Sequence, residues 1–213
     1  MISVILLMAG SGRRMNIEDN KVFLPLGEKR VFEHALQMFL NFGFEVICVI
    51  RPEDRQFLSD YYAQVKIVYG GKTRQESVYH GLKEATQDFV LIHDAARPFV
   101  SKEMIESCIH AFHENQACMV GTSCKDSLYL KSPLQVVHRE EIVLAQTPQG
   151  GCTKVLLNCH QMAMKEDKTF TDDISLLLQY SDTTVKIIEN EEANFKITTK
   201  LDYIVAKEWV KNV

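Results

Sequence analysis

The sequence predicts an α/β fold: a Rossmann-like, mostly parallel sheet with helices on both faces, and a protruding β-arm. Short apolar runs alternate along the chain with segments whose apolar residues recur at helical spacing. This alternation is typical of parallel strands that are joined by helices and covered on both sides. One stretch, at about residues 123–147, breaks the alternation and is expected to form the arm.

The predicted strands and helices follow one another from the N-terminus. The strands are expected at Ile2–Met8, Glu45–Ile50, Val65–Tyr69, Phe89–His93 and Ala117–Thr122. The helices between them are expected at Val31–Asn41, Arg55–Tyr62, Arg74–Ala85 and Lys102–Glu114. Ligands bind to such sheets at the carboxyl ends of the strands, so we expect the loops after the strands to meet at one rim.

The predicted arm contains two strand-like segments, Ser127–Leu130 and Leu134–His138, on either side of Lys131-Ser132-Pro133. This pattern predicts a hairpin. An exposed arm with an apolar face often docks on a second subunit, so we expect a homodimer formed through the arm. The alternative is a flexible surface segment that contacts no second subunit.

After the arm the α/β pattern resumes. We expect Thr171 to cap a helix that bears Ile174, Leu177 and Leu178, and two further strands at Val185–Ile188 and Phe195–Ile197. Thr199 and Asp202 fit a capping box for a final helix. Its apolar residues are Leu201, Ile204, Val205 and Trp209. The chain shows no repeats or linkers, so residues 1–213 are predicted to form a single domain with the arm attached.

Composition excludes several classes of protein. The 213 residues are 46% hydrophobic and 24% charged, which suits one globular domain. The net charge of -4 provides no basic field for nucleic acid. No apolar stretch approaches the ~18 residues of a membrane span. The six cysteines include no Cys-x-x-Cys pair, so we expect reduced thiols in a cytoplasmic protein rather than a zinc site.

A glycine-rich loop follows the first predicted strand, at residues 8–14 (Met-Ala-Gly-Ser-Gly-Arg-Arg). Gly10 and Gly12 allow backbone N–H groups to approach a bulky anion. Arg13 and Arg14 add forked donors that match phosphate oxygens. The loop therefore predicts a polyphosphate site, with an ordinary strand-to-helix turn as the alternative.

Two better-known phosphate loops do not fit this segment. Met15 stands where a dinucleotide fingerprint needs its third glycine, and the second strand runs into Arg51 rather than an acid. A Walker A motif is absent from the sequence. A hydride-transfer enzyme and a P-loop NTPase are thus both disfavoured.

Polar residues follow several other strands. Lys21 lies in the loop beyond the arginines, where it could reach a phosphate or be merely solvated. The segment 70–77 begins with two glycines and opens a helix, whose start offers free N–H groups. Asp94 ends the fourth strand three residues before Arg97. It could hold Mg²⁺ together with substrate phosphates, bind a sugar hydroxyl, or form a structural pair with the arginine. Lys196 lies within a short apolar segment and could face the same rim or solvent.

Together these segments resemble the cytidylyltransferases of the non-mevalonate isoprenoid pathway, from Ile2 to Trp209. The similarity rests on Ala-Gly-x-Gly-x-Arg-Met (residues 9–15), Gly-Gly-x-x-Arg-x-x-Ser-Val-x-x-Gly-Leu (70–82), His-Asp-Ala-Ala-Arg-Pro (93–98), Gln-Thr-Pro-Gln (146–149), Thr-Asp-Asp (171–173) and Asn-x-Lys-Ile-Thr (194–198). The third of these motifs is highly specific, whereas the glycine loop is shared with many nucleotidyltransferases.

The resemblance implies roles for named positions. The catalytic cations would be Arg14, Lys21 and Lys196. The nucleotide would be bound by Met8, Ala9, Gly10, Gly12, Arg13, Gly71, Ser77 and Asp94, and Asp94 would also hold Mg²⁺ or another divalent cation. The second substrate would be bound by Arg97, Ser127, Arg139, Thr147 and Thr171, with Ser127 and Arg139 reaching it across the dimer.

The implied activity is transfer of the CMP moiety of CTP to methylerythritol phosphate, with release of pyrophosphate. A ribitol 5-phosphate cytidylyltransferase shares this chemistry and is the alternative, although Ala96 favours the methylerythritol enzyme because the ribitol enzymes tend to have valine there. An inactive nucleotide-binding regulator is disfavoured, since the phosphate-facing cations are present.

The chain departs from the family pattern in three places. Asn20-Lys21-Val22 replaces the usual Pro-Lys-Gln, which keeps the lysine and loses a rigid proline. Ser127 replaces threonine, and Lys72 stands at a position that is often acidic.

Overall fold

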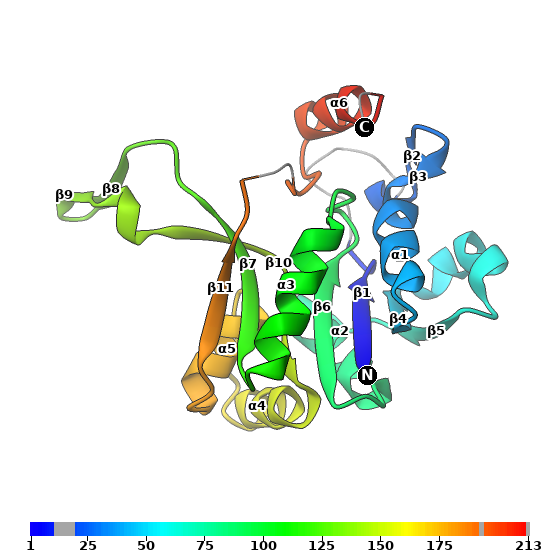
Figure 1. Ribbon diagram of the computed structural model, residues 1–213, viewed down its shortest axis with the longest axis horizontal. Helices are drawn as coiled ribbons and strands as arrows, with labels where there is room; N and C mark the ends of the chain where they lie inside the picture. The colour runs from blue at the N-terminus through cyan, green and yellow to red at the C-terminus, as the bar shows by residue number, and fades with distance from the viewer. Residues whose placement is uncertain (11–19, 192–193, 212–213) are drawn as a thin grey trace.

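The computed structural model describes residues 1–10, 20–191 and 194–211. Its centre is a seven-stranded sheet in the order β11-β7-β10-β6-β1-β4-β5 (Figure 1). The strands are β1 (Ile2–Leu7), β4 (Glu45–Ile50), β5 (Val65–Tyr69), β6 (Phe89–Asp94), β7 (Ala117–Ser123), β10 (Val143–Cys152) and β11 (Val185–Glu189). All neighbouring strands are parallel except β10, which is antiparallel to both β6 and β7. The predicted mostly parallel sheet is confirmed.

Helices cover both faces of the sheet, as predicted. Side chains alternate across a strand, so Val4 and Leu6 of β1 join one core cluster while Ile5 joins another. The first cluster includes residues of α1 (Val31–Asn41) and α3 (Lys102–His113). The second includes residues of α2 (Arg74–Glu84), α4 (Thr153–Lys165) and α5 (Asp173–Tyr180). The sheet is therefore buried on both sides.

Two predicted elements are wrong. The helix expected at 55–62 is a 3-10 helix, η3 (Pro52–Tyr61), in which only Asp54 and Leu58 are buried. The strand expected at 195–197 is an irregular segment, whose Ile197 packs in a third cluster with Leu26 and Val31. In both segments apolar side chains, Leu58 and Ile197, are buried, but the backbone does not form the α-helix or the strand that was expected.

The prediction missed β10 and α4, which follow one another directly. The second half of β10 reads Thr-Pro-Gln-Gly-Gly, which lacks the apolar character of a buried strand. Gly150 explains this composition, because a Cβ atom built there would lie 2.1 Å from the carbonyl oxygen of Val90. Close packing against β6 therefore requires glycine where a sequence pattern expects a branched residue.

The stretch predicted as an arm holds a two-stranded antiparallel hairpin, β8 (Leu128–Lys131) and β9 (Leu134–Val137), followed by the 3-10 turn η4 (Arg139–Glu141). Figure 1 shows this hairpin projecting away from the central sheet. Its large apolar side chains are exposed, namely Tyr129, Leu130, Leu134 and Val136. Dimerisation through this surface stays a prediction.

The C-terminal region contains the expected helix with an unexpected surface. In α6 (Lys200–Trp209), Thr199 and Asp202 form the predicted capping box. The apolar residues Leu201, Ile204, Val205 and Trp209 are nevertheless exposed, and Ala206 is the buried residue of this helix. The cap of α5 is also displaced by one residue, because Asp172, rather than Thr171, accepts a hydrogen bond from the Ser175 amide. Short strands β2 (Pro25–Leu26) and β3 (Lys29–Arg30) pair beside α1.

Within the described ranges, no helix has both the length and the apolar character that are needed to cross a membrane.

Candidate active site

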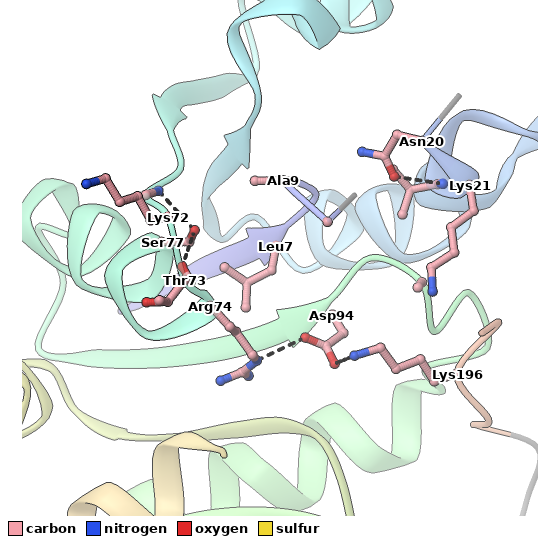
Figure 2. A pocket seen from close by; sticks show the side chains of 14 residues that line it. Leu7, Ala9, Asn20, Lys21, Lys72, Thr73, Arg74, Ser77, Asp94 and Lys196 are labelled. Atoms are coloured by element: carbon pink, nitrogen blue, oxygen red, sulfur yellow. Dashed lines mark hydrogen bonds and ion pairs between the residues drawn. The ribbon is translucent and has the colours of Figure 1, made fainter. Parts of the chain in front are cut away.

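A cavity of about 580 Å³ opens at the carboxyl ends of β1, β5 and β6 (Figure 2). The predicted site residues that line it are Ala9, Gly10, Lys21, Gly71, Ser77, Asp94 and Lys196. They come from segments far apart in the sequence. Ala9, Gly10, Gly71 and Asp94 lie at or just after the ends of parallel strands, which meet at one edge of the sheet. The expected convergence at one rim is confirmed for these residues.

The glycine loop enters the cavity through its first residues. Ala9 and Gly10 line the wall, and a Cβ atom built on Gly10 would meet no described atom within 4 Å. Met8 is buried behind them, and its amide donates a hydrogen bond to the Val49 carbonyl at 2.8 Å. Gly12, Arg13 and Arg14 lie outside the described residues.

The second glycine loop packs tightly against the first. A Cβ atom on Gly70 would lie 2.7 Å from the Cβ of Ala9, so glycine is required for this approach. The Ser77 hydroxyl accepts a hydrogen bond from the Gly71 amide at 3.1 Å and donates one to the Thr73 carbonyl at 2.9 Å. Thr73 in turn caps α2 by accepting a bond from the Glu76 amide. Ser77 thereby fixes the loop that forms one wall of the cavity.

Asp94 is the acidic centre of the site. Figure 2 shows Arg74 and Lys196 reaching its carboxylate from opposite sides. The Lys196 ammonium lies 2.7 Å from Oδ2, and Nε of Arg74 lies 3.4 Å from Oδ1. Burial opposes ionisation of Asp94, but the two cations outweigh this effect and hold its pKa below the usual range. The carboxylate is therefore charged at neutral pH.

Sequence reasoning assigned no role to Arg74, although this residue belongs to the segment 70–82 on which the resemblance rests. Its Nη2 donates to Oδ2 of Asp173 at 2.8 Å, and Asp173 is buried at the start of α5. Despite burial, Asp173 and Asp94 raise the pKa of Arg74 above its ordinary value. Arg74 thus joins the two carboxylates, a link between α2 and α5 that spacing in the sequence could not reveal.

Thr147 lies behind Asp94 rather than on the cavity wall. Its Oγ1 accepts a hydrogen bond from the Asp94 amide at 3.1 Å and lies 3.1 Å from Nδ1 of His93. Burial lowers the pKa of His93 to about 4, so the ring is neutral at physiological pH. A neutral ring whose Nε2 donates to the Arg97 carbonyl leaves Nδ1 to accept from Thr147. Thr147 therefore orients the backbone that carries Asp94.

The segment that carries Lys196 is held by its neighbours. The Asn194 amide group donates to the Thr147 carbonyl at 2.8 Å, and the Ile197 amide donates to the Ala96 carbonyl at 2.8 Å. Arg97 also serves this segment, since its Nη1 donates to the Asn194 carbonyl at 2.8 Å. These bonds place Lys196 beside Asp94 without a β-ladder.

The remaining predicted residues lie away from the described lining of the cavity. Thr171 is exposed just before α5. Ser127 precedes β8, and Arg139 donates from Nη1 to the Lys125 carbonyl at 2.8 Å and pairs with Glu140. The resemblance assigns Ser127 and Arg139 to the site of a second chain, so their contacts with substrate stay predictions.

The lining provides one carboxylate for a cation. No group of three or more His, Cys, Asp or Glu side chains in the described part of the chain could hold a metal ion. Mg²⁺ commonly uses one or two carboxylates and completes its shell with water and substrate phosphates. Asp94 fits a cation that is shared with a phosphorylated ligand, rather than one that the protein holds alone.

The chemistry of the cavity follows from its charges. Lys21, Arg74 and Lys196 surround it, together with the start of α2 and two glycine loops. Cationic side chains and free helix N–H groups both favour phosphate oxygens. The arrangement suits a phosphorylated nucleotide and a second anion.

Comparisons with known proteins agree with this geometry. Residues 2–212 match the family IspD, described as 2-C-methyl-D-erythritol 4-phosphate cytidylyltransferase. A relative of that name from Clostridioides difficile is 37% identical, with 98% of this chain and 93% of the relative covered. Another from Alkaliphilus oremlandii is 35% identical, with 98% and 94% covered.

Solved structures show the same similarity. The 4-diphosphocytidyl-2C-methyl-D-erythritol synthase of Anaerococcus prevotii superposes with a TM-score of 0.87 at 30% identity, covering 99% of this chain and 98% of the other. The 2-C-methyl-D-erythritol 4-phosphate cytidylyltransferase of Thermus thermophilus gives a TM-score of 0.81 at 30% identity, covering 97% and 98%. The chain therefore belongs to the IspD family of cytidylyltransferases, which are nucleotidyl-transferring enzymes.

Proposed function

We propose that this enzyme transfers the CMP moiety of CTP to 2-C-methyl-D-erythritol 4-phosphate, giving 4-diphosphocytidyl-2-C-methyl-D-erythritol and pyrophosphate. The observation that carries this proposal is the gathering of Lys21, Asp94 and Lys196 around one cavity in a member of this family. The product would enter the synthesis of isoprenoid precursors.

In the proposed reaction a phosphate oxygen of the polyol phosphate attacks the α-phosphorus of CTP. A new P–O bond forms there, the bond to the β-phosphate breaks, and pyrophosphate leaves with the electron pair. The attacking phosphate is largely a dianion near neutral pH, so no strong general base is needed. The obstacle is to bring two polyanions together, and positioning and electrostatic stabilisation supply most of the catalysis.

The cations share this work. Lys21 and Arg14 would bind the triphosphate, and Lys196 would stabilise charge at the transferring phosphorus. Asp94 would hold a divalent cation such as Mg²⁺ jointly with the phosphates; when bound, such a cation neutralises phosphate charge. Arg74, fixed by Asp173, keeps the Asp94 carboxylate ionised and oriented.

The nucleotide would occupy the described cavity, and the polyol phosphate would bind beside it through residues that are not part of the described lining. The nucleotide would lie on Met8–Gly10, Gly12, Arg13, Gly71 and Ser77. The polyol phosphate would lie near Arg97, Thr147 and Thr171, with Ser127 and Arg139 supplied by a second chain of a homodimer. The exposed apolar side chains of the hairpin support that dimer. The described cysteines are free thiols, which supports a cytoplasmic location.

A pyrophosphate-release assay with CTP and Mg²⁺ tests the proposal, using methylerythritol 4-phosphate and ribitol 5-phosphate side by side. We expect faster turnover of the methylerythritol substrate, and Ala96, which lines the cavity, is the position to vary if the preference is weak. Faster turnover of ribitol 5-phosphate would assign the enzyme to the alternative substrate. No release with either substrate would overturn the proposed activity.

A further inference from the structure

Lys21 depends on a very short element for its position. It begins the 3-10 turn η2 (Lys21–Phe23), and a turn of this length does not hold itself in water. Asn20 caps the turn, because its Oδ1 accepts a hydrogen bond from the Val22 amide at 3.4 Å. Asn20 also lines the cavity next to Lys21 (Figure 2). The orientation of the Asn20 side chain therefore determines the backbone position from which the Lys21 side chain extends.

The other end of the Asn20 side chain is tied to the glycine loop. Its Nδ2 donates to the Met8 carbonyl at 2.6 Å, one residue before Ala9 enters the cavity wall. The same nitrogen donates to Oδ2 of Asp54 at 3.2 Å. One amide group thus connects the end of β1, the turn that bears Lys21, and the start of η3, which follows β4.

Asp54 is itself fixed by Arg51. Nε of Arg51 donates to Oδ2 at 2.7 Å and Nη2 donates to Oδ1 at 2.8 Å, which is the two-pronged geometry of the strongest side-chain hydrogen bonds. Asn20 and Asp54 are each 2% exposed. A rotated Asn20 amide would place its oxygen against the Met8 and Asp54 oxygens, so its orientation is determined by these partners.

We propose that Arg51, Asp54 and Asn20 form a positioning unit that holds Lys21 against the glycine loop before the nucleotide arrives. This inference rests on the proposed function, in which Lys21 binds the triphosphate of CTP. It also answers the expected loss of rigidity at Asn20, where the family pattern has proline: three hydrogen bonds from one buried amide restrain the chain instead of a ring. A lysine fixed in this way stabilises developing charge without first reorganising.

The test is a double-mutant cycle between Asn20 and Lys21, read as kcat for pyrophosphate release. Asn20→Ala should lower kcat by ~10–100-fold, as loss of a group that orients a functional side chain does. In the Lys21→Ala background the same change should cost less than ~2-fold, because Asn20 then has no lysine to position. Equal losses in both backgrounds would overturn the proposal, since they would mean that Asn20 acts independently of Lys21.

Two further variants keep the test decisive. Asp54→Asn preserves the shape of the side chain and removes the negative charge that Arg51 binds. It should lower kcat less than Asn20→Ala does, and it should have no effect on kcat when Lys21 is alanine. This variant provides the test if Asn20→Ala does not fold. Asn158→Ala, on the exposed face of α4, is the matched control and should leave kcat unchanged. A wild-type kcat for the single variant Lys21→Ala would instead refute the role of Lys21 in the proposed function.

Discussion

The rim of the sheet and the hairpin arm are both predicted to contact substrate, but they are built in opposite ways. At the rim, Asp94 and Asp173 are buried and are bridged by Arg74 from a distant segment. On the arm, Arg139 is exposed and bonds only Lys125 and Glu140 among the described residues. The rim is thus preformed within one chain, whereas an arm residue can become part of a site only when something packs on it.

The difference extends to how charge is handled. The carboxylates at the rim are buried and their cationic partners are partly buried, so an unpaired carboxylate there is costly and the pairs are less screened than on the surface. Charges on the arm remain solvated and screened, so their pairing adds little to stability. Substitutions at the rim should therefore change chemistry and, where they break an ion pair of a buried carboxylate, stability. Substitutions on the arm should change binding and assembly.

The largest effect is expected from removing a cation at the rim. Lys21→Ala should lower turnover on the order of 10²–10³, as loss of a preorganised donor does, while the protein stays folded. The sequence predicts the same loss for Arg14→Ala. Steady-state pyrophosphate release measures both, with exposed Lys154→Ala as the control. Near-wild-type pyrophosphate release by both variants would mean that Lys21 and Arg14 do not contribute to catalysis.

Removing the rim carboxylate should affect stability as well. Asp94→Asn leaves Lys196 without its anion and Arg74 with Asp173 alone. Because the Arg74 and Lys196 side chains are 30% and 33% exposed, we expect a loss smaller than the ~3–5 kcal/mol of breaking a fully buried pair. Because the folded-state pKa of Asp94 is depressed, its contribution is present above the unfolded pKa of ~3.9 and is lost as pH falls toward the folded value. Urea unfolding at several pH values should show the difference at pH 7 and its decline below pH ~4. A pH-independent difference would contradict the ion-pair explanation.

On the arm, Arg139→Ala should act on binding. We expect the KM for the polyol phosphate to rise ~10–100-fold, the equivalent of one hydrogen bond to a charged group, with the KM for CTP unchanged. Lys131→Ala, also exposed on the arm, is the matched control. Equal increases in both KM values would mean that Arg139 does not act specifically on binding of the polyol phosphate.

The smallest effect on folding is expected from Leu134→Asp. Leu134 is 78% exposed, so the free energy of unfolding of the single chain should change by no more than ~0.5 kcal/mol. The mass measured by analytical ultracentrifugation should nevertheless fall from dimer to monomer, because the charge disrupts an apolar interface. Leu201→Asp on α6 tests whether the dimer depends on the arm rather than on any exposed apolar side chain, and it should leave the measured mass unchanged. A monomeric wild-type protein would refute the arm-mediated dimer.

The sequence predicted the parts of the site that follow strands. Asp94 and Gly71 could be placed because the carboxyl ends of parallel strands share a rim, and Lys196 was placed by the resemblance with no need for its segment to be a strand. The link through Arg74 and Asp173 could not be predicted, since it joins residues 99 positions apart. Thr171 and Asp172 are both good helix caps, so sequence alone could not choose between them.

The errors in the fold have a common physical cause. Apolar periodicity reports where side chains can be buried, not where they are. It overlooked β10, whose packing demands Gly150, and it gave no sign that Leu201 and Ile204 of the final helix are exposed. A pattern read along one segment does not contain the shape of the surface against which that segment packs.

β10 has a practical consequence for anyone who wishes to trim this enzyme. Its first residues pair with Ser123 and Thr122 of β7, and its last residues pair with β6, so the same strand leaves the hairpin and enters the middle of the sheet. Deleting the entire region 123–147 would remove half of an interior strand. A shortened version has to be cut near the hairpin tip, between β8 and β9, where the two halves of the chain already lie side by side.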